Sequence, residues 1–224
     1  METSQIQTVQ SSFSSYMTFV FGWMFYGMII SGIAAILVYA SPALQEAVLG
    51  SSAVFYTMIA LQLGAVLLIS LLLNRINALV AFLLFSFYSA LTGLTLSSLL
   101  FVYDFKMLGG VFFMTAGIYG VMATLGYVTK VDLSGLRTFF LMAILGIIGF
   151  SVANIFIGSS GLDLILSYVT ILVFSGLTAY DMQRIRKASQ MGIRDQKYAI
   201  LDALGMYINF INIFLSILNI VGRD

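Results

Sequence analysis

Charged residues divide the chain into long apolar stretches. Seven runs of 17 to 43 residues contain no Asp, Glu, Lys or Arg. A helix needs about 20 apolar residues to cross a hydrocarbon core of roughly 30 Å, so each run holds one membrane span. The first run could hold two, but residues 1–16 form a polar tail rich in Ser, Thr and Gln. We predict seven transmembrane helices, at about 17–40, 52–74, 77–102, 108–129, 138–158, 162–182 and 199–221.

Composition excludes several classes of protein. Apolar residues make up 61% of the chain and charged residues only 8%, against roughly 25% in soluble domains, so the chain is predicted to be an all-α integral membrane protein. Cysteine and histidine are both absent, which excludes disulfides, thiol or imidazole catalysis and Cys/His zinc sites. The net charge of +1 gives no basic surface for nucleic acid, and we expect no cofactor.

The placement of Lys and Arg predicts the orientation. With the N-terminus in the cytoplasm, the loops on that side carry eight of the ten basic residues, and only Lys106 and Arg223 lie outside. The positive-inside rule therefore predicts a cytoplasmic N-terminus and an extracytoplasmic C-terminus. We expect the basic group Arg184, Arg186 and Lys187 to contact anionic lipid headgroups.

The order of the spans is compatible with an internal repeat. Seven spans divide into three, three and one, with the two triplets in opposite orientations. The segments Thr92-Gly93-Leu94-Thr95 and Ser175-Gly176-Leu177-Thr178 are similar and lie in the third and sixth spans. We predict one transmembrane domain covering residues 1–224.

Polar residues gather on one face of the last span. At 100° per residue the following positions fall within an arc of about 100°: Asp202, Gly205, Asn209, Asn212, Ser216 and Asn219. The sixth span adds Thr170, Thr178 and Asp181 on roughly one face. Two interpretations fit these stripes, a hydrated pathway or hydrogen bonds that only hold helices together. We take Asn212, Ser216, Asn219, Thr178 and Thr170 as candidate pore-lining residues.

Two carboxylates approach the predicted cytoplasmic surface from neighbouring spans. Asp181 lies near the end of the sixth span and Asp202 about one turn into the seventh. If their oxygens come within about 4–6 Å, they titrate as a coupled pair and could bind calcium transiently. Arg75 lies at the same level and could pair with either, while the alternative is that Asp181 only caps the bundle.

Three segments resemble a known family. They are Phe87–Ser98, Gly176–Gln183 and Ala203–Leu215, and they resemble the signature segments of the Bax inhibitor-1 (transmembrane Bax inhibitor motif) family, bacterial inner-membrane branch. The resemblance implies a fold of seven helices in which a central seventh helix is surrounded by two antiparallel three-helix groups. It also implies a multi-pass protein of the bacterial inner membrane.

The resemblance implies a pH-sensitive calcium leak channel, with calcium or other cations and the lipid bilayer as partners. Family members sense pH with one aspartate on the sixth helix and one on the seventh, and an arginine latches to them. Asp181 matches the first aspartate and Arg75 the latch. The second position holds Asn209, because Met206-Tyr-Ile-Asn-Phe-Ile-Asn212 stands where the family has Leu-Tyr-Leu-Asp-Phe-Ile-Asn. Either Asp202 substitutes for that aspartate or the paired sensor is lost.

Two other functions remain as alternatives. The chain could be a regulatory protein that modulates a membrane protease through its N-terminal tail, residues 3–16. An intramembrane aspartyl protease is the more remote alternative, since Tyr180-Asp181 fits its first motif. The second motif requires Gly-x-Gly-Asp, and this chain has Ala199-Ile-Leu-Asp202, so we expect no enzymatic activity.

Overall fold

The structure is a computed structural model that describes residues 2–72, 75–191 and 196–223. These residues form nine α-helices and one 3₁₀ turn, and they contain no strand. Six helices are long and apolar enough to cross a membrane. The bent pair of α2 (Pro42–Leu49) and α3 (Ser52–Leu72), with 75° between the two, would count as a seventh if it forms a single span. The predicted all-helical membrane architecture is therefore confirmed, and the seven-span arrangement stays a prediction.

The chain forms two compact units. Unit 1 holds residues 1–105 and 192–207, and unit 2 holds residues 106–191 and 208–224. Unit 1 contains α1 (Glu2–Ala40), α2, α3, α4 (Ala78–Leu96), α5 (Leu99–Val102) and the first part of α9 (Gln196–Val221). Unit 2 contains α6 (Phe105–Val128) from its second residue, η1 (Ser134–Leu136), α7 (Arg137–Ile157), α8 (Ser160–Gln190) and the rest of α9. Each unit thus holds three long helices that precede its part of α9.

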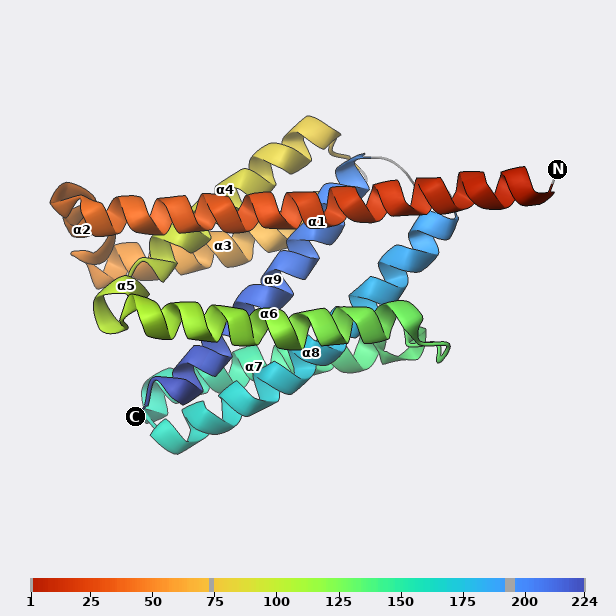
Figure 1. Cartoon of the computed structure of the whole chain (residues 1–224). Coiled ribbons are helices and arrows are strands. Elements are labelled where there is room, and N and C mark those ends of the chain that lie inside the picture. Colours follow the sequence, from red (N-terminus) through yellow and green to blue (C-terminus); the bar gives the residue numbers. More distant parts are fainter. Residues whose placement is uncertain (1, 73–74, 192–195, 224) are drawn as a thin grey trace. The chain divides into compact units, whose positions relative to one another are not determined.

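In unit 1, α4 packs closely along α1 and α3 (Figure 1). A Cβ atom at Gly93 would collide with the backbone of Ser31, so only glycine allows this approach of the two helices. Toward the α2 end, Val38, Val48 and Met58 form a buried apolar core that joins α1, α2 and α3.

Helix starts and ends in the chain follow local signals. Ser41 caps α2, whose first residue is Pro42, and Asn77 caps α4 through a 2.9 Å bond from the Val80 N–H. α7 ends at Gly158, which has a left-handed φ of 67° that glycine adopts without strain. The predicted spans 17–40 and 52–74 left residues 41–51 outside any helix, so α2 was not predicted.

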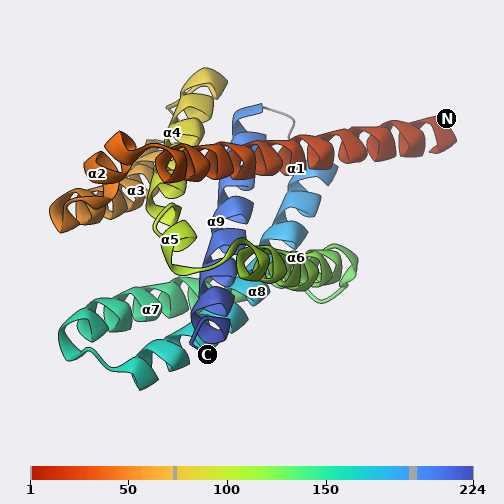
Figure 2. The ribbon, with the colours of Figure 1, turned by 60° about the vertical axis from the view of Figure 1, so that its left-hand side comes forward.

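Unit 2 is built around the antiparallel hairpin of α7 and α8, which Figure 2 shows joined by a short turn. A Cβ atom at Gly176 would lie 3.0 Å from the Phe140 ring, so the glycine lets α7 pack tightly on α8. Gly126 plays the same part for α6, since a Cβ there would collide with the Ala179 carbonyl of α8. Both contacts hold the middle of α8, where Thr178 and Asp181 lie.

Candidate ion-pathway residues on α8 and α9

The carboxylate of Asp181 lies inside unit 2. Asp181 is only 8% exposed, and its Oδ2 accepts a 2.9 Å hydrogen bond from Nδ2 of Asn209, which is 2% exposed. The two residues come from different helices, α8 and α9. The contact therefore places one ionisable group beside one neutral amide within a stretch apolar enough to span a membrane.

Arg184 supplies a positive charge to the same carboxylate. Its Nη2 lies 3.2 Å from Oδ1 of Asp181, one turn away on α8, and half of the Arg184 side chain is exposed. Asp181 thus lies between a buried amide and a cation at the edge of the unit.

The last two turns of α8 hold the loop between α6 and α7. The Gln183 side chain accepts a 2.9 Å bond from the Leu133 N–H and donates a 2.7 Å bond to the Val131 carbonyl. Arg186 donates to the carbonyls of Tyr127 and Thr129, where α6 ends and the last helical carbonyls lack partners. This loop fixes the helix turn that carries Asp181.

Lys187 completes the attachment of this loop. Its Nζ lies 2.5 Å from Oδ1 of Asp132 and also donates to Ser134. The bond from Lys187, helped by two bonds from Ser134, holds the pKa of the Asp132 carboxyl well below its usual range. Arg186 and Lys187 thus bind protein oxygens, and contact of the basic group with lipid headgroups stays a prediction.

Asp202 and Arg75 belong to unit 1. Oδ2 of Asp202 accepts a 2.8 Å hydrogen bond from the hydroxyl of Tyr16, a residue that is 3% exposed. Arg75 is exposed in the turn that precedes α4. Since Asp181 belongs to unit 2, its pairing with Asp202 or with Arg75 stays a prediction.

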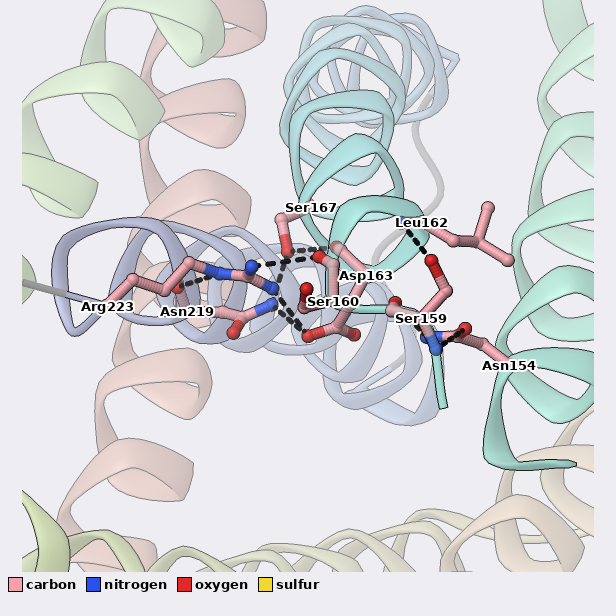
Figure 3. Close-up of polar contacts among 8 residues, drawn as sticks. All are labelled: Asn154, Ser159, Ser160, Leu162, Asp163, Ser167, Asn219 and Arg223. Carbon is pink, nitrogen blue, oxygen red and sulfur yellow. Dashed lines mark hydrogen bonds and ion pairs between the residues drawn. The ribbon is translucent and has the colours of Figure 1, made fainter. Parts of the chain in front are cut away.

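A second polar cluster joins the start of α8 to the end of α9 (Figure 3). Oδ2 of Asp163 accepts bonds from Asn219 Nδ2 at 3.1 Å and from Arg223 Nη2 at 2.8 Å. Asn219 also donates to Ser167 at 2.7 Å, and Arg223 donates to the Ser160 carbonyl at 2.8 Å. The cluster ties the two helix ends together and engages Asn219, a candidate pore-lining residue.

The other candidate pore-lining residues mostly bond to their own helix. The Asn212 amide donates to the Ile208 carbonyl and the Thr178 hydroxyl to the Phe174 carbonyl, both at 2.8 Å. Such bonds leave side-chain oxygens able to accept from water or to coordinate a cation. Thr170 and Ser216 are each 8% exposed, so all of these residues lie within or at the edge of the packed unit.

Comparison with known proteins decides the family. The family described as inhibitor of apoptosis-promoting Bax1 matches residues 13–224. This chain belongs to the Bax inhibitor-1 family. It is 38% identical over 219 residues to inner membrane protein YbhL of Escherichia coli strain K12, covering 96% of this chain and 94% of that protein. An uncharacterised protein of Deinococcus radiodurans is 38% identical over 92% of this chain and 89% of its own length. An uncharacterised protein of Rickettsia prowazekii is 32% identical over 99% of this chain and 94% of its own length.

Within the Bax inhibitor-1 family, the sequence resemblance assigned an aspartate to the position of Asn209. The structure brings this position against Asp181, so the two residues that the resemblance pairs are in contact. The pair carries one carboxylate instead of two. In the part of the chain that the structure describes, no group of three or more acidic residues could hold a metal ion.

The sequence did not predict three contacts of aspartate side chains. They are Tyr16 with Asp202, Arg184 with Asp181, and Arg223 with Asp163. The contact of Asp181 with Arg184 could have been predicted from their spacing, since residues three apart share a helix face. The other two contacts join residues at least 60 positions apart, and no local pattern predicts them.

Proposed function

We propose that this protein is a cation leak channel of the bacterial inner membrane, with calcium as its ion and pH as its regulator. The proposal follows from family membership together with one observation: a buried carboxylate, Asp181, contacts a polar residue of α9 inside unit 2. Ionisable residues within membrane spans are costly, and they usually mark ion or proton pathways.

The donor set of the site suits a hard cation. Calcium prefers carboxylate, amide and carbonyl oxygens, and Asp181, Asn209 and Asn212 can supply the first two kinds. With a single carboxylate, binding is expected to be weak and transient, as passage through a pathway requires.

Calcium flux into proteoliposomes tests the proposal. Purified protein in calcium-free vesicles should admit external calcium, at a rate that changes with pH. Vesicles with the same amount of protein but no flux at any pH would contradict a leak channel.

The proposed topology has seven spans, with α2 and α3 as one bent span and α9 as the central seventh helix. The N-terminus is cytoplasmic and the C-terminus is outside. Met191, at the end of α8, is 73% exposed, so Met191→Cys in this cysteine-free chain should react from the cytoplasmic side. A cysteine added after Asp224 should react from the other side, and labelling of both from one side would contradict this topology.

We propose that Arg75 latches the closed state through Asp181. Arg75→Ala would then raise resting calcium flux, and Arg137→Ala, which removes an exposed arginine from the first residue of α7, would not. Equal resting flux in the two variants would contradict the latch, and Arg75 would then contribute only to the orientation of the protein in the membrane.

A role in modulating a membrane protease is the second candidate, and the length of α1 favours it. The helix has 39 residues, about 58 Å, whereas its apolar part, Tyr16–Ala40, has 25. The polar segment before Tyr16 could bind a partner. Deleting residues 2–12 should leave calcium flux unchanged and abolish regulation if this second role exists.

A further inference from the structure

Unit 1 contains a line of polar side chains that the proposed function does not use. Its centre is the segment Thr92–Thr95 of α4, with Gln62 of α3 facing it. Thr92 donates to Oε1 of Gln62 at 3.3 Å, and Nε2 of Gln62 donates to Thr95 at 3.3 Å. Both threonine hydroxyls also donate to carbonyls of their own helix at 2.9 Å, so Gln62 adds longer contacts that join α3 to this part of α4.

The line continues into the middle of unit 1. Thr92 donates to the Tyr88 carbonyl at 2.9 Å, and the Tyr88 ring lies edge-on to the ring of Tyr207 on α9, with the centroids 6.0 Å apart. The Tyr207 hydroxyl lies 2.6 Å from the Ser31 hydroxyl, which donates to the Ser89 carbonyl at 2.7 Å. Tyr207 and Ser89 are both 0% exposed, and Thr92 is 3% exposed. Polar groups from α1, α3, α4 and α9 therefore meet in the interior of a unit that is otherwise apolar.

The side chain of Ser89 lacks a partner in this interior. Its Oγ is fully buried and has no hydrogen-bond partner among the residues that the structure describes. An unsatisfied buried hydroxyl is costly, and proteins usually satisfy such groups with ordered water. The Ser89 hydroxyl therefore indicates that water reaches the polar line.

The other end of the line lies beside an open pocket. The pocket has a volume of about 350 Å³ and is lined by Leu49, Ser52, Phe55, Tyr56, Ser98 and Phe101. Ser98 is three residues beyond Thr95, and its hydroxyl donates to the Thr95 carbonyl at 2.9 Å. Through this bond Ser98, a lining residue of the pocket, contacts the backbone of Thr95 at the end of the polar line.

We propose that unit 1 holds a hydrated cation path, which enters through this pocket and runs along Gln62, Thr95 and Thr92 to the Ser31–Tyr207 pair. Its ligands are neutral oxygens, namely hydroxyls, the Gln62 amide and backbone carbonyls, and these suit a partly hydrated calcium ion. Its use by cations rests on the proposed leak function, whereas its hydration does not.

Cysteine accessibility tests the hydration. Single cysteines at Ser98, Thr95 and Gln62 are treated in permeabilised proteoliposomes with a cationic thiol reagent that cannot enter lipid. Thiols react as thiolates, which form only in contact with water. Leu63→Cys is the matched control, because Leu63 is the next residue on α3 at nearly the same depth and is 53% exposed on the outer surface of the unit.

The expected result is modification at all three path positions, at least tenfold faster than at Leu63. Reaction at Ser98 alone would overturn the proposal, because the pocket would then be a closed depression. Equal rates at Gln62 and Leu63 would overturn it too.

Flux variants test whether cations use the path. Gln62→Leu should lower calcium flux several-fold, and Gln62→Glu should raise calcium selectivity, because a carboxylate binds calcium better than an amide does. Leu63→Ile is the control and should behave like the parent. Flux in the parent but no change in Gln62→Leu would overturn the cation path. Absence of flux in every protein, with labelling intact, would contradict the leak function and leave the hydrated path standing.

Discussion

The amide of Asn209 donates a 2.9 Å hydrogen bond to the carboxylate of Asp181. An aspartate at position 209 would put a second carboxylate in the same place, where two negative charges repel or share a proton. The Asn209 amide instead donates to Asp181 and brings no second negative charge. Asparagine at position 209 therefore leaves the site with one negative charge, whereas a paired-carboxylate sensor has two.

Asn209→Asp should steepen the pH dependence of calcium flux and move its midpoint upward. The cause is that two carboxylates in contact hold one proton between them and titrate as a coupled pair. Asn154→Asp is the control, because the Asn154 side chain bonds to the Ser159 backbone at the end of α7. A pH profile of Asn209→Asp that matches the parent would mean that position 209 takes no part in gating.

Asp132→Asn should lower the thermal stability of the protein at neutral pH. The folded protein holds the pKa of Asp132 below the usual value of about 3.9, so the contribution is present above that value and disappears as the pH falls below it. The difference in melting temperature between parent and variant should therefore shrink in strong acid. Because Asp132 stays ionised at milder pH, the variant should keep the parent's pH midpoint of flux, and a shifted midpoint would assign the sensor to the α6–α7 loop.

Gly126→Ala should destabilise unit 2 by about 1–3 kcal/mol, because the added methyl group collides with the Ala179 carbonyl and forces α6 away from α8. Gly120→Ala, on the same helix with no heavy atom near its new Cβ, should be neutral or stabilising by up to about 1 kcal/mol. Thermal unfolding in detergent measures both. Similar stability of the two variants would argue against the close packing of α6 on α8.

Arg223→Gln should cost less than about 1 kcal/mol, because both partners of its ion pair with Asp163 are partly exposed and water screens them. Asn219→Ala should cost more, about 1–2 kcal/mol, since it leaves Ser167 and Asp163 each without one bond. High salt should remove the effect of Arg223→Gln and leave that of Asn219→Ala. A larger cost for Arg223→Gln would mean that the charge pair, not the amide, holds the ends of α8 and α9.

The hydropathy pattern predicted most helix positions, because a long apolar run in lipid must satisfy its backbone hydrogen bonds internally and therefore forms a helix. The expected spans 108–129 and 138–158 lie within three residues of α6 (Phe105–Val128) and α7 (Arg137–Ile157). The expected span 162–182 stops eight residues before α8 ends at Gln190. The charge-free run ends at Tyr180, but Arg186 and Lys187 bind oxygens of the α6–α7 loop, so the helix continues.

The sequence could not predict which polar residues of α9 contact which partner. Helical periodicity places Asp202 and Asn209 on one face, yet Asp202 bonds to Tyr16 in unit 1 and Asn209 to Asp181 in unit 2. Those partners are set by packing between helices far apart in the chain. The contact of Gln62 with Thr92 and Thr95 was also missed, because a single glutamine within an apolar part of α3 does not indicate which helix it faces.

Calcium flux through Asp181→Asn, measured in proteoliposomes from acidic to alkaline pH, tests the account most directly. Asp104→Asn, which neutralises an exposed aspartate of unit 1, is the matched control. The account predicts that Asp181→Asn changes the rate of flux and flattens its pH dependence, while Asp104→Asn behaves like the parent. Parent-like rate and pH dependence in Asp181→Asn would contradict it.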